Sequence, residues 1–112
     1  MVTLAGSTFR KPDEFSARDV AVLFKALADP LRIQLVAIIS AAPVEELSFH
    51  ELAEHFSMPQ SSLSHHLRIL VRAGVFERRR TGTWSKYRLS REALQLMRAA
   101  LQPEVLRAYR PP

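Results

Sequence analysis

The hydrophobic pattern of the first third of the chain predicts two helices. Apolar residues recur at helical spacing between about Glu14 and Ala28, and these predict the first helix. Asp29 and Pro30 then fit the N-cap and the first turn of a second helix that ends near residues 42–43. The residues expected to point inward are Val20, Leu23, Phe24 and Leu27 in the first helix and Leu31, Leu35, Ile38 and Ile39 in the second.

Two more helices, joined by a short turn, are predicted between Ser48 and Gly74. Ser48 and Glu51 fit a capping box at the start of a short helix over about 49–56, with Leu47 and Leu52 placed to form a hydrophobic staple. A longer helix follows from Pro59 or Gln60 to Ala73, with Ser57 and Gln60 as a second capping box and Gly74 just past its end. Its buried face is expected at Leu63, Leu67 and Leu70. The pair is a helix–turn–helix.

The period changes after Gly74. Residues 75–80 and 83–89 are short runs rich in aromatic and β-branched side chains, and Thr81–Gly82 separates them, which predicts a β-hairpin. Ser90 then caps a last helix with an apolar stripe at Leu94, Met97 and Leu101, which Pro103 kinks or restarts. The predicted fold is mainly α with a small β-hairpin wing, a winged helix–turn–helix.

The chain of 112 residues fits one domain. We expect residues 1–13 to form a flexible N-terminal arm and residues 14–112 to form the single winged domain. The first and last helices carry more apolar surface than so small a core covers. A homodimer that pairs through the N- and C-terminal helices is therefore expected.

The charge of the chain is concentrated in one segment. Its net charge is +5, but residues 68–91 contain eight basic residues and one acid, so this segment carries +7 and the rest carries −2. A basic segment favours a polyanionic partner, nucleic acid before an acidic membrane. The chain contains no cysteine, no secretory signal and no apolar run long enough to cross a bilayer, so we expect a cytoplasmic protein without a membrane partner.

The second helix of the helix–turn–helix presents polar residues away from its leucine face. Ser61, Ser62, His65, Arg68 and Arg72 are placed to reach DNA, although a solvated polar face would show the same pattern. His66 leans toward the buried face, where a packed and hydrogen-bonded histidine is expected.

The hairpin carries basic residues on both sides of its predicted turn: Arg78, Arg79, Arg80 and Lys86. Strand alternation puts Arg78 and Arg80 on one face and Arg79 on the other, so only some of them can touch one DNA duplex. We expect Trp84 and Tyr87 to anchor the wing rather than to stack on bases.

Several short motifs together resemble the ArsR/SmtB family of bacterial transcription regulators. They are residues 23–32 (LFKALADPLR), 51–53 (ELA), 60–67 (QSSLSHHL) and 70–75 around Ala73-Gly74-Val75. The resemblance implies a homodimer that binds a double-stranded operator and represses transcription until an inducer relieves it. It also implies that the recognition helix includes Gln60, Ser61, Ser62, Ser64 and His65.

The chain departs from the thiolate metal sensors of this family. The positions of their cysteine pair hold Ser48 and His50, and residues 91–112 contain no histidine. His50 and Glu54 lie four apart, as do Glu51 and His55, so a nitrogen and oxygen site for Ni(II) or Zn(II) is a hypothesis. Such a site would need further donors from the arm, at Asp13 or Glu14, or from a second copy. The competing interpretation is a solvated acidic helix face.

Other functions stay open to different degrees. An enzyme is not expected, because adjacent residues such as Ser64, His65 and His66 do not face one another on a helix and the chain has no glycine-rich phosphate loop. A winged-helix regulator controlled by a protein partner or a non-metal ligand remains an alternative. A winged-helix adaptor for protein or RNA is another. The residues do not decide between repression and activation.

Overall fold

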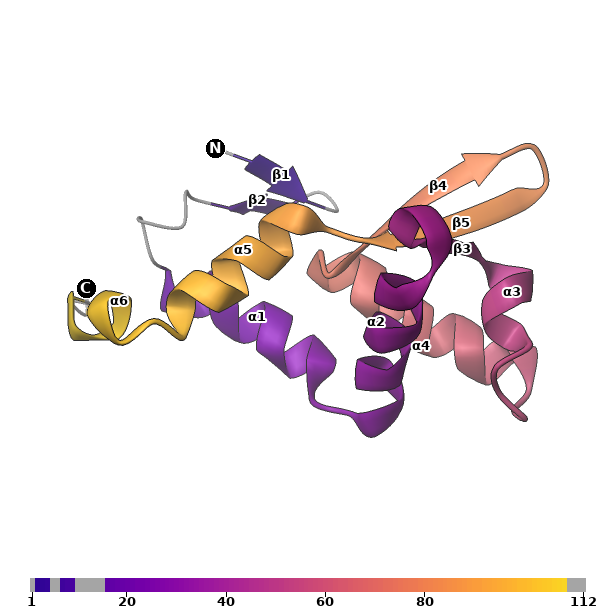
Figure 1. The fold of residues 1–112 in the computed structure, drawn as a ribbon, viewed down its shortest axis with the longest axis horizontal. Coiled ribbons are helices and arrows are strands. Elements are labelled where there is room, and N and C mark those ends of the chain that lie inside the picture. Colours follow the sequence, from indigo (N-terminus) through magenta and orange to yellow (C-terminus); the bar gives the residue numbers. More distant parts are fainter. Residues whose placement is uncertain (1, 5–6, 10–15, 109–112) are drawn as a thin grey trace.

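The computed structural model describes residues 2–4, 7–9 and 16–108 and confirms the winged helix–turn–helix fold (Figure 1). The described helices are α1 (Ala17–Leu27), α2 (Pro30–Ala41), α3 (Phe49–Ala53), α4 (Gln60–Ala73), α5 (Arg91–Ala100) and α6 (Pro103–Ala108). The described strands are β1 (Val2–Leu4), β2 (Ser7–Phe9), β3 (Glu46–Ser48), β4 (Phe76–Thr81) and β5 (Trp84–Leu89). A short 3-10 turn, Pro43–Glu45, joins α2 to β3.

Side-chain caps set where the first three helices begin. α1 starts at Ala17, not at Glu14 as predicted, because the Ser16 hydroxyl accepts a hydrogen bond from the amide of Asp19 at 3.3 Å. Asp29 caps α2 as predicted, accepting from the Leu31 amide at 2.8 Å. Both hydrogen bonds of the predicted capping box at Ser48 and Glu51 are present, at 2.9 and 3.1 Å. α3 is shorter than predicted, since it ends at Ala53.

α4 runs from Gln60 to Ala73, within the predicted bounds, but its N-terminal cap differs from the prediction. The second capping box is wrong: the N-cap is Pro59, which makes no side-chain cap. Gln60 is thus the first residue of the helix rather than the third, and cannot reach back to complete a box with Ser57. Gly74 closes the helix with φ 92°, a left-handed conformation that glycine adopts without a steric penalty.

The turn of the wing lies one residue later in the chain than predicted, and the wing has a third strand. Thr81 pairs with Trp84, so the turn is Gly82–Thr83 rather than Thr81–Gly82, and Gly82 takes the positive φ of 62°. β3 joins the hairpin in the order β3-β5-β4, with Ser48 opposite Lys86. A strand of three residues is too short to show alternation, and the sequence analysis missed it.

Part of the predicted N-terminal arm forms two short strands. β1 and β2 pair antiparallel, with Val2 opposite Phe9, and β1 lies against α5 (Figure 1). The flexibility of the arm stays a prediction, and the other residues of the arm lie outside those described, as do Glu14 and Tyr109.

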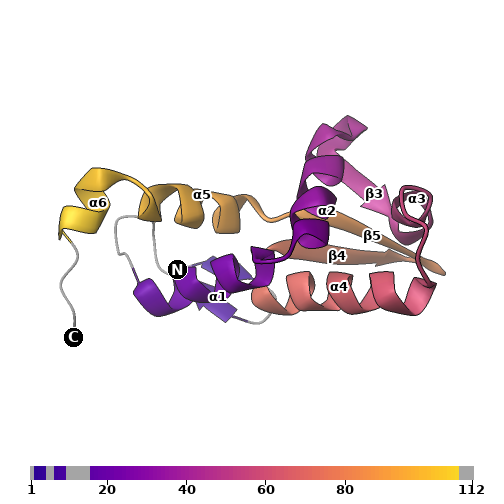
Figure 2. The ribbon, with the colours of Figure 1, turned by 90° about the horizontal axis from the view of Figure 1, so that it is seen from below.

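The core lies between α1, α2, α4, α5 and one face of the sheet. Figure 2 shows α4 lying along the sheet and α1 alongside α5. The leucines of α4 are at most 1% exposed, which confirms the predicted buried face. In α2 only Leu35 and Ile39 are fully buried, while Leu31 and Ile38 are half-buried.

Only one of the three residues of the predicted apolar stripe of the last helix faces the core. Met97 is buried, but Leu94 is 37% and Leu101 65% exposed. Ala93, Leu96 and Ala100 face the core instead, because small alanines allow α5 to approach α1 closely. Leu94 and Leu101 are thus left outward while Leu96 faces the core, and Pro103 starts α6, as predicted. No helix among the described residues is long and apolar enough to cross a membrane.

Candidate nucleic-acid interface

α4 presents most of its predicted DNA-reading residues to solvent. Gln60, Ser61, His65 and Arg68 are exposed, while Ser62 and Ser64 are half-buried beside the leucine face. Short hydroxyl side chains in the first turns of a helix permit close approach to a phosphate or a base edge. The amino-terminal half of α4 therefore has the shape of a reading surface.

His66 is a packed, hydrogen-bonded histidine, as predicted. Its Nδ1 lies 3.1 Å from Nη1 of Arg32, whose Nε donates to the carbonyl of Ala26 at 2.6 Å. A guanidinium only donates, so the Nδ1 atom must accept in this contact. Only 14% of the Arg32 side chain is exposed, and Asp29 lies 3.9 Å from it. Arg32 thus connects the end of α1 to α4.

The predicted division of the wing arginines is confirmed by the strand register. Arg78 and Arg80 alternate with Arg79 and lie on the face that carries buried Phe76 and Tyr87, which is the side of α4. Arg79 lies on the outer face and forms an ion pair with Glu46 at 2.8 Å.

Lys86 lies on the outer face as well, opposite Arg79 in the register. Arg88 is on the same face and pairs with Glu77 at 2.9 Å, a contact that raises the pKa of Arg88. Hydrogen bonds from the backbone and hydroxyl of Ser48 lower the pKa of Glu51, and the charge of Lys86 lowers it further. The role of Lys86 in DNA binding stays a prediction, and it would need a different approach from that of Arg78.

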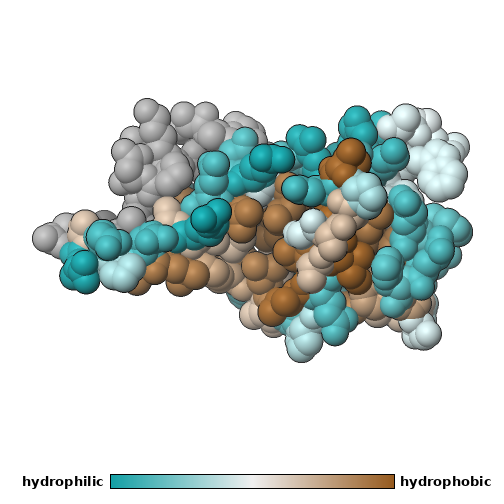
Figure 3. Space-filling model, in the orientation of Figure 1, coloured by the Kyte–Doolittle hydropathy of each residue, from teal (hydrophilic) through white to brown (hydrophobic). Residues whose placement is uncertain are grey.

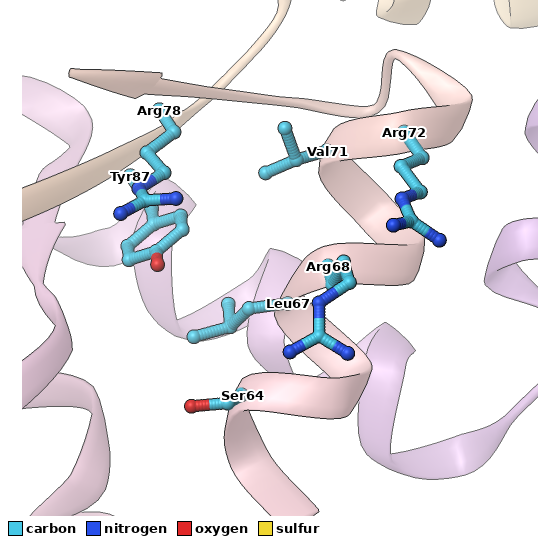
Figure 4. Close-up of a pocket in the computed structure, with 7 residues that line it drawn as sticks. All are labelled: Ser64, Leu67, Arg68, Val71, Arg72, Arg78 and Tyr87. Atoms are coloured by element: carbon cyan, nitrogen blue, oxygen red, sulfur yellow. The ribbon is translucent and has the colours of Figure 1, made fainter. Parts of the chain in front are cut away.

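A groove of about 480 Å³ separates α4 from the wing (Figure 4). Its walls are Ser64, Leu67, Arg68, Val71 and Arg72 of α4 and Arg78 and Tyr87 of the wing. Arg78 donates to the Ser85 hydroxyl at 3.1 and 3.2 Å, and Tyr87 is its partner in the strand register, so both side chains line the same wall of the groove (Figure 4). The sequence analysis placed Arg72 on the outward side of the helix, but no signal in it pointed to a groove.

Trp84 and Tyr87, the two wing residues expected to act as anchors, differ in burial. Tyr87 is 7% exposed and anchors the wing, as expected. Trp84 is not buried as an anchor in the core: it is 54% exposed near the turn, and its ring makes an edge contact with the His50 ring of α3, with centroids 6.4 Å apart. The register shift moves Trp84 next to the turn, beyond the reach of the core.

The candidate metal ligands lie on α3 and just after it. His50 Nε2 lies 3.7 Å from Glu54 Oε1, and both side chains are about two-thirds exposed, at 70% and 67%. Glu51 is turned toward the Ser48 amide that it caps. The described part of the chain brings no three His, Cys, Asp or Glu side chains together. Asp13 and Glu14 lie outside the described residues.

Comparison with known proteins assigns the family. The sequence profile described as "Bacterial regulatory protein, arsR family" matches residues 29–77, from the α2 cap into β4. The arsenical resistance operon repressor of Staphylococcus xylosus is 33% identical over 79 residues, covering 70% of this chain and 73% of that protein. The transcriptional repressor SdpR of Bacillus subtilis is 34% identical over 73 residues, covering 65% and 78%.

The chain belongs to the ArsR family. Solved structures agree with this assignment. The HlyU regulator of Vibrio vulnificus superposes with a TM-score of 0.58 at 31% identity, covering 73% of this chain and 83% of that one. A second ArsR-family regulator superposes with a TM-score of 0.69 at 24% identity, covering 85% and 97%, and supports the fold. ArsR-family regulators bind double-stranded operators and commonly act as dimers. This ArsR-family protein is a DNA-binding transcription regulator.

Proposed function

We propose that this ArsR-family protein binds its operator as a homodimer and represses transcription from it. The observation that carries the proposal is the distribution of charge around the wing. On the α4 side, no described acidic side chain forms an ion pair with Arg68, Arg72, Arg78 or Arg80, whereas Arg79 and Arg88 on the outer face are paired with acids. Unpaired cations that share one side with a recognition helix suit a polyanion.

Exposed apolar residues support a dimer through the terminal helices. Val22 on α1, Leu94 on α5 and Leu106 on α6 are 46%, 37% and 51% exposed, and Leu101 after α5 is 65% exposed. Apolar surface is visible along the α1–α5 end of the molecule in Figure 3. A second copy that covers these residues with its own would form a two-fold interface. It would also place two α4 helices on successive turns of one duplex face.

Within the proposed complex, the two parts of the interface act differently. Gln60, Ser61, Ser62, Ser64 and His65 at the start of α4 read the major groove. Arg80 and Lys86 of the wing, with Arg68, contact the backbone and contribute affinity without sequence preference.

The test is binding of the purified full chain to duplexes from its own upstream region, measured against salt. A duplex binder with six phosphate contacts loses roughly 10³-fold in affinity or more between low and moderate salt. An affinity that does not change with salt concentration, or a preference for RNA over duplex DNA, would contradict the proposal and favour a winged-helix adaptor. Repression is tested by transcription in vitro from a bound promoter. Activation there would leave the DNA-binding part intact and overturn the repressor part.

Metal control is a separate hypothesis, favoured only by the proximity of His50 to Glu54. Two ligands are too few for a tight Ni(II) or Zn(II) site, so a third must come from the arm or from a second copy. Titration of the dimer with each metal tests this, with His50→Ala as the variant. Stoichiometric binding that His50→Ala abolishes would support the site. Unchanged binding would contradict it and direct the search for the inducer to a small molecule or a partner protein.

A further inference from the structure

The groove between α4 and the wing combines an apolar floor with cationic walls. Leu67 and Tyr87 are 1% and 7% exposed and form the floor, with half-buried Val71 beside them. Arg68 rises from the helix wall and Arg78 from the wing wall, and the Ser64 and Tyr87 hydroxyls are directed toward the space between them (Figure 4). The Arg72 side chain lies at the rim and points away from Arg78 in that view.

The charges of this groove are not balanced by the described residues. The ion pairs of the wing, Arg79–Glu46 and Arg88–Glu77, lie on the opposite face of the sheet. Arg78 makes its side-chain hydrogen bonds to a neutral hydroxyl, that of Ser85. Arg68 and Arg78 are both exposed, so an anion from outside can reach both guanidinium groups, and no described acid is paired with either of them.

In a complex with duplex DNA, a backbone phosphate would lie at the groove between α4 and the wing. A helix in the major groove and a wing in the adjacent minor groove are separated by one strand of the sugar–phosphate backbone, which must pass between them. From this geometry we infer that the α4–wing groove is a seat for one backbone phosphate of each half-site, held by Arg68 and Arg78 and by the Tyr87 hydroxyl. This inference rests on the proposed function, because it requires α4 to enter the major groove.

The phosphate seat fixes the position of the protein along the duplex and does not read the base sequence. A guanidinium can donate two parallel hydrogen bonds to phosphate oxygens, and the contact of Arg78 with Ser85 orients its planar group in advance. The contact is the same for every base, so it contributes affinity to all duplexes. It also sets how far the amino-terminal half of α4 extends along the base edges.

The experiment replaces single phosphates of a bound operator duplex by neutral methylphosphonates, one position at a time. Wild-type protein should lose roughly 10- to 100-fold in affinity at one position per half-site, the loss typical of a charge-assisted hydrogen bond. Arg78→Gln should lose part of this factor on the unmodified duplex, and should lose less than wild type when that one phosphate is neutral, because only Arg68 and Tyr87 still contact it. Arg78→Lys keeps the positive charge but not the planar pair of donors. Its affinity for the unmodified duplex should therefore lie between those of wild type and Arg78→Gln.

Arg88→Gln is the matched control, because it removes the same charge from the same wing on the outer face. It should follow wild type at every methylphosphonate position, and circular dichroism should show that all variants are folded. Equal losses for wild type and Arg78→Gln at every position would overturn the inference.

Inorganic phosphate distinguishes a free anion from the DNA backbone as the occupant. If phosphate alone shifts the NMR signals of Leu67 and Tyr87 while the methylphosphonate scan is flat, the groove binds a free anion and the inference is wrong. If wild type binds no duplex at all, the proposed function fails together with it. Binding with a flat scan refutes only the phosphate seat.

Discussion

Removing the ring of His66 tests whether the Arg32–His66 contact stabilises the fold. His66→Ala takes away the acceptor of Arg32 Nη1, which lies 3.1 Å from Nδ1. The Arg32 side chain is only 14% exposed, so water replaces the lost partner poorly. A hydrogen bond to a charged group contributes about 1.5–3 kcal/mol, and we expect a loss of about 2 kcal/mol in the free energy of unfolding.

Urea unfolding measures this loss. With a slope of about 2 kcal/mol per molar, the midpoint should fall by about 1 M. Protein concentration is held fixed, because unfolding of a dimer depends on it. His65→Ala is the matched control: it lies one residue away on the same helix, is exposed, and makes no side-chain hydrogen bond among those described. Alanine is the better helix former by a few tenths of a kcal/mol, which offsets the loss of the edge contact between the His65 and His66 rings, whose centroids are 5.7 Å apart, so this control should be close to neutral.

His66→Asn separates the hydrogen bond from the volume of the ring. The Oδ1 atom of asparagine occupies nearly the position of Nδ1 and can accept from Arg32, so this variant should recover part of the midpoint. If His66→Ala unfolds at the same urea concentration as His65→Ala, the contact contributes nothing and the reasoning is refuted. If Asn is no better than Ala, packing of the ring and not the hydrogen bond explains the loss.

Three further predictions concern single side chains. Ser90 is fully buried and caps α5 by accepting from the Ala93 amide at 3.2 Å, so Ser90→Ala should cost about 1 kcal/mol in thermal or urea unfolding, and an unchanged midpoint would contradict this. The lowered pKa of Glu51 means that its contribution is present above the pKa of the unfolded chain and is lost as pH falls through the lower folded value. Wild type should therefore lose stability in acid more steeply than Glu51→Gln, and parallel curves would show that the cap does not titrate. Leu101→Glu places a charge on the exposed apolar surface, so sedimentation should find monomers that bind duplex DNA more weakly, whereas an intact dimer would exclude this surface as the interface.

Signals carried by a few neighbouring residues were enough to predict most of the helical fold. The Asp29 cap, the Ser48–Glu51 box and Gly74 each depend on one hydrogen bond or one backbone conformation, and each is where the sequence placed it. The leucine face of α4 also followed from spacing alone. Ser57 and Gln60 fit the same capping pattern as Ser48 and Glu51, yet Pro59 takes the cap position, because sequence alone does not set which residue starts a helix.

Features that depend on distant residues were not predictable in this way. β3 exists because Ser48 pairs with Lys86, far along the chain. Leu94 faces outward because Ala93 and Ala100 occupy the face of α5 that packs against the core. Helical spacing alone does not tell this alanine face from the predicted leucine stripe. The groove needs the helix wall and the wing wall together, so the sequence could name Arg68 and Arg78 as separate candidates but could not show that they face one space.

The salt dependence of binding decides how much of the basic segment faces DNA. Its eight basic residues would give a dimer up to sixteen contacts, and a slope of log affinity against log salt near −14. The structure pairs Arg79 with Glu46 and Arg88 with Glu77, and leaves four arginines on the α4 side: Arg68, Arg72, Arg78 and Arg80. With Lys86, which the proposed complex also places on the DNA backbone, a dimer makes ten contacts and the slope is about −9. Counting charge along the sequence overestimates the interface because Glu46, which neutralises Arg79, lies outside the segment. Glu46→Gln should therefore steepen the slope only if Arg79 can turn to the duplex, and a slope for wild type near −14 would refute the division of the wing into two faces.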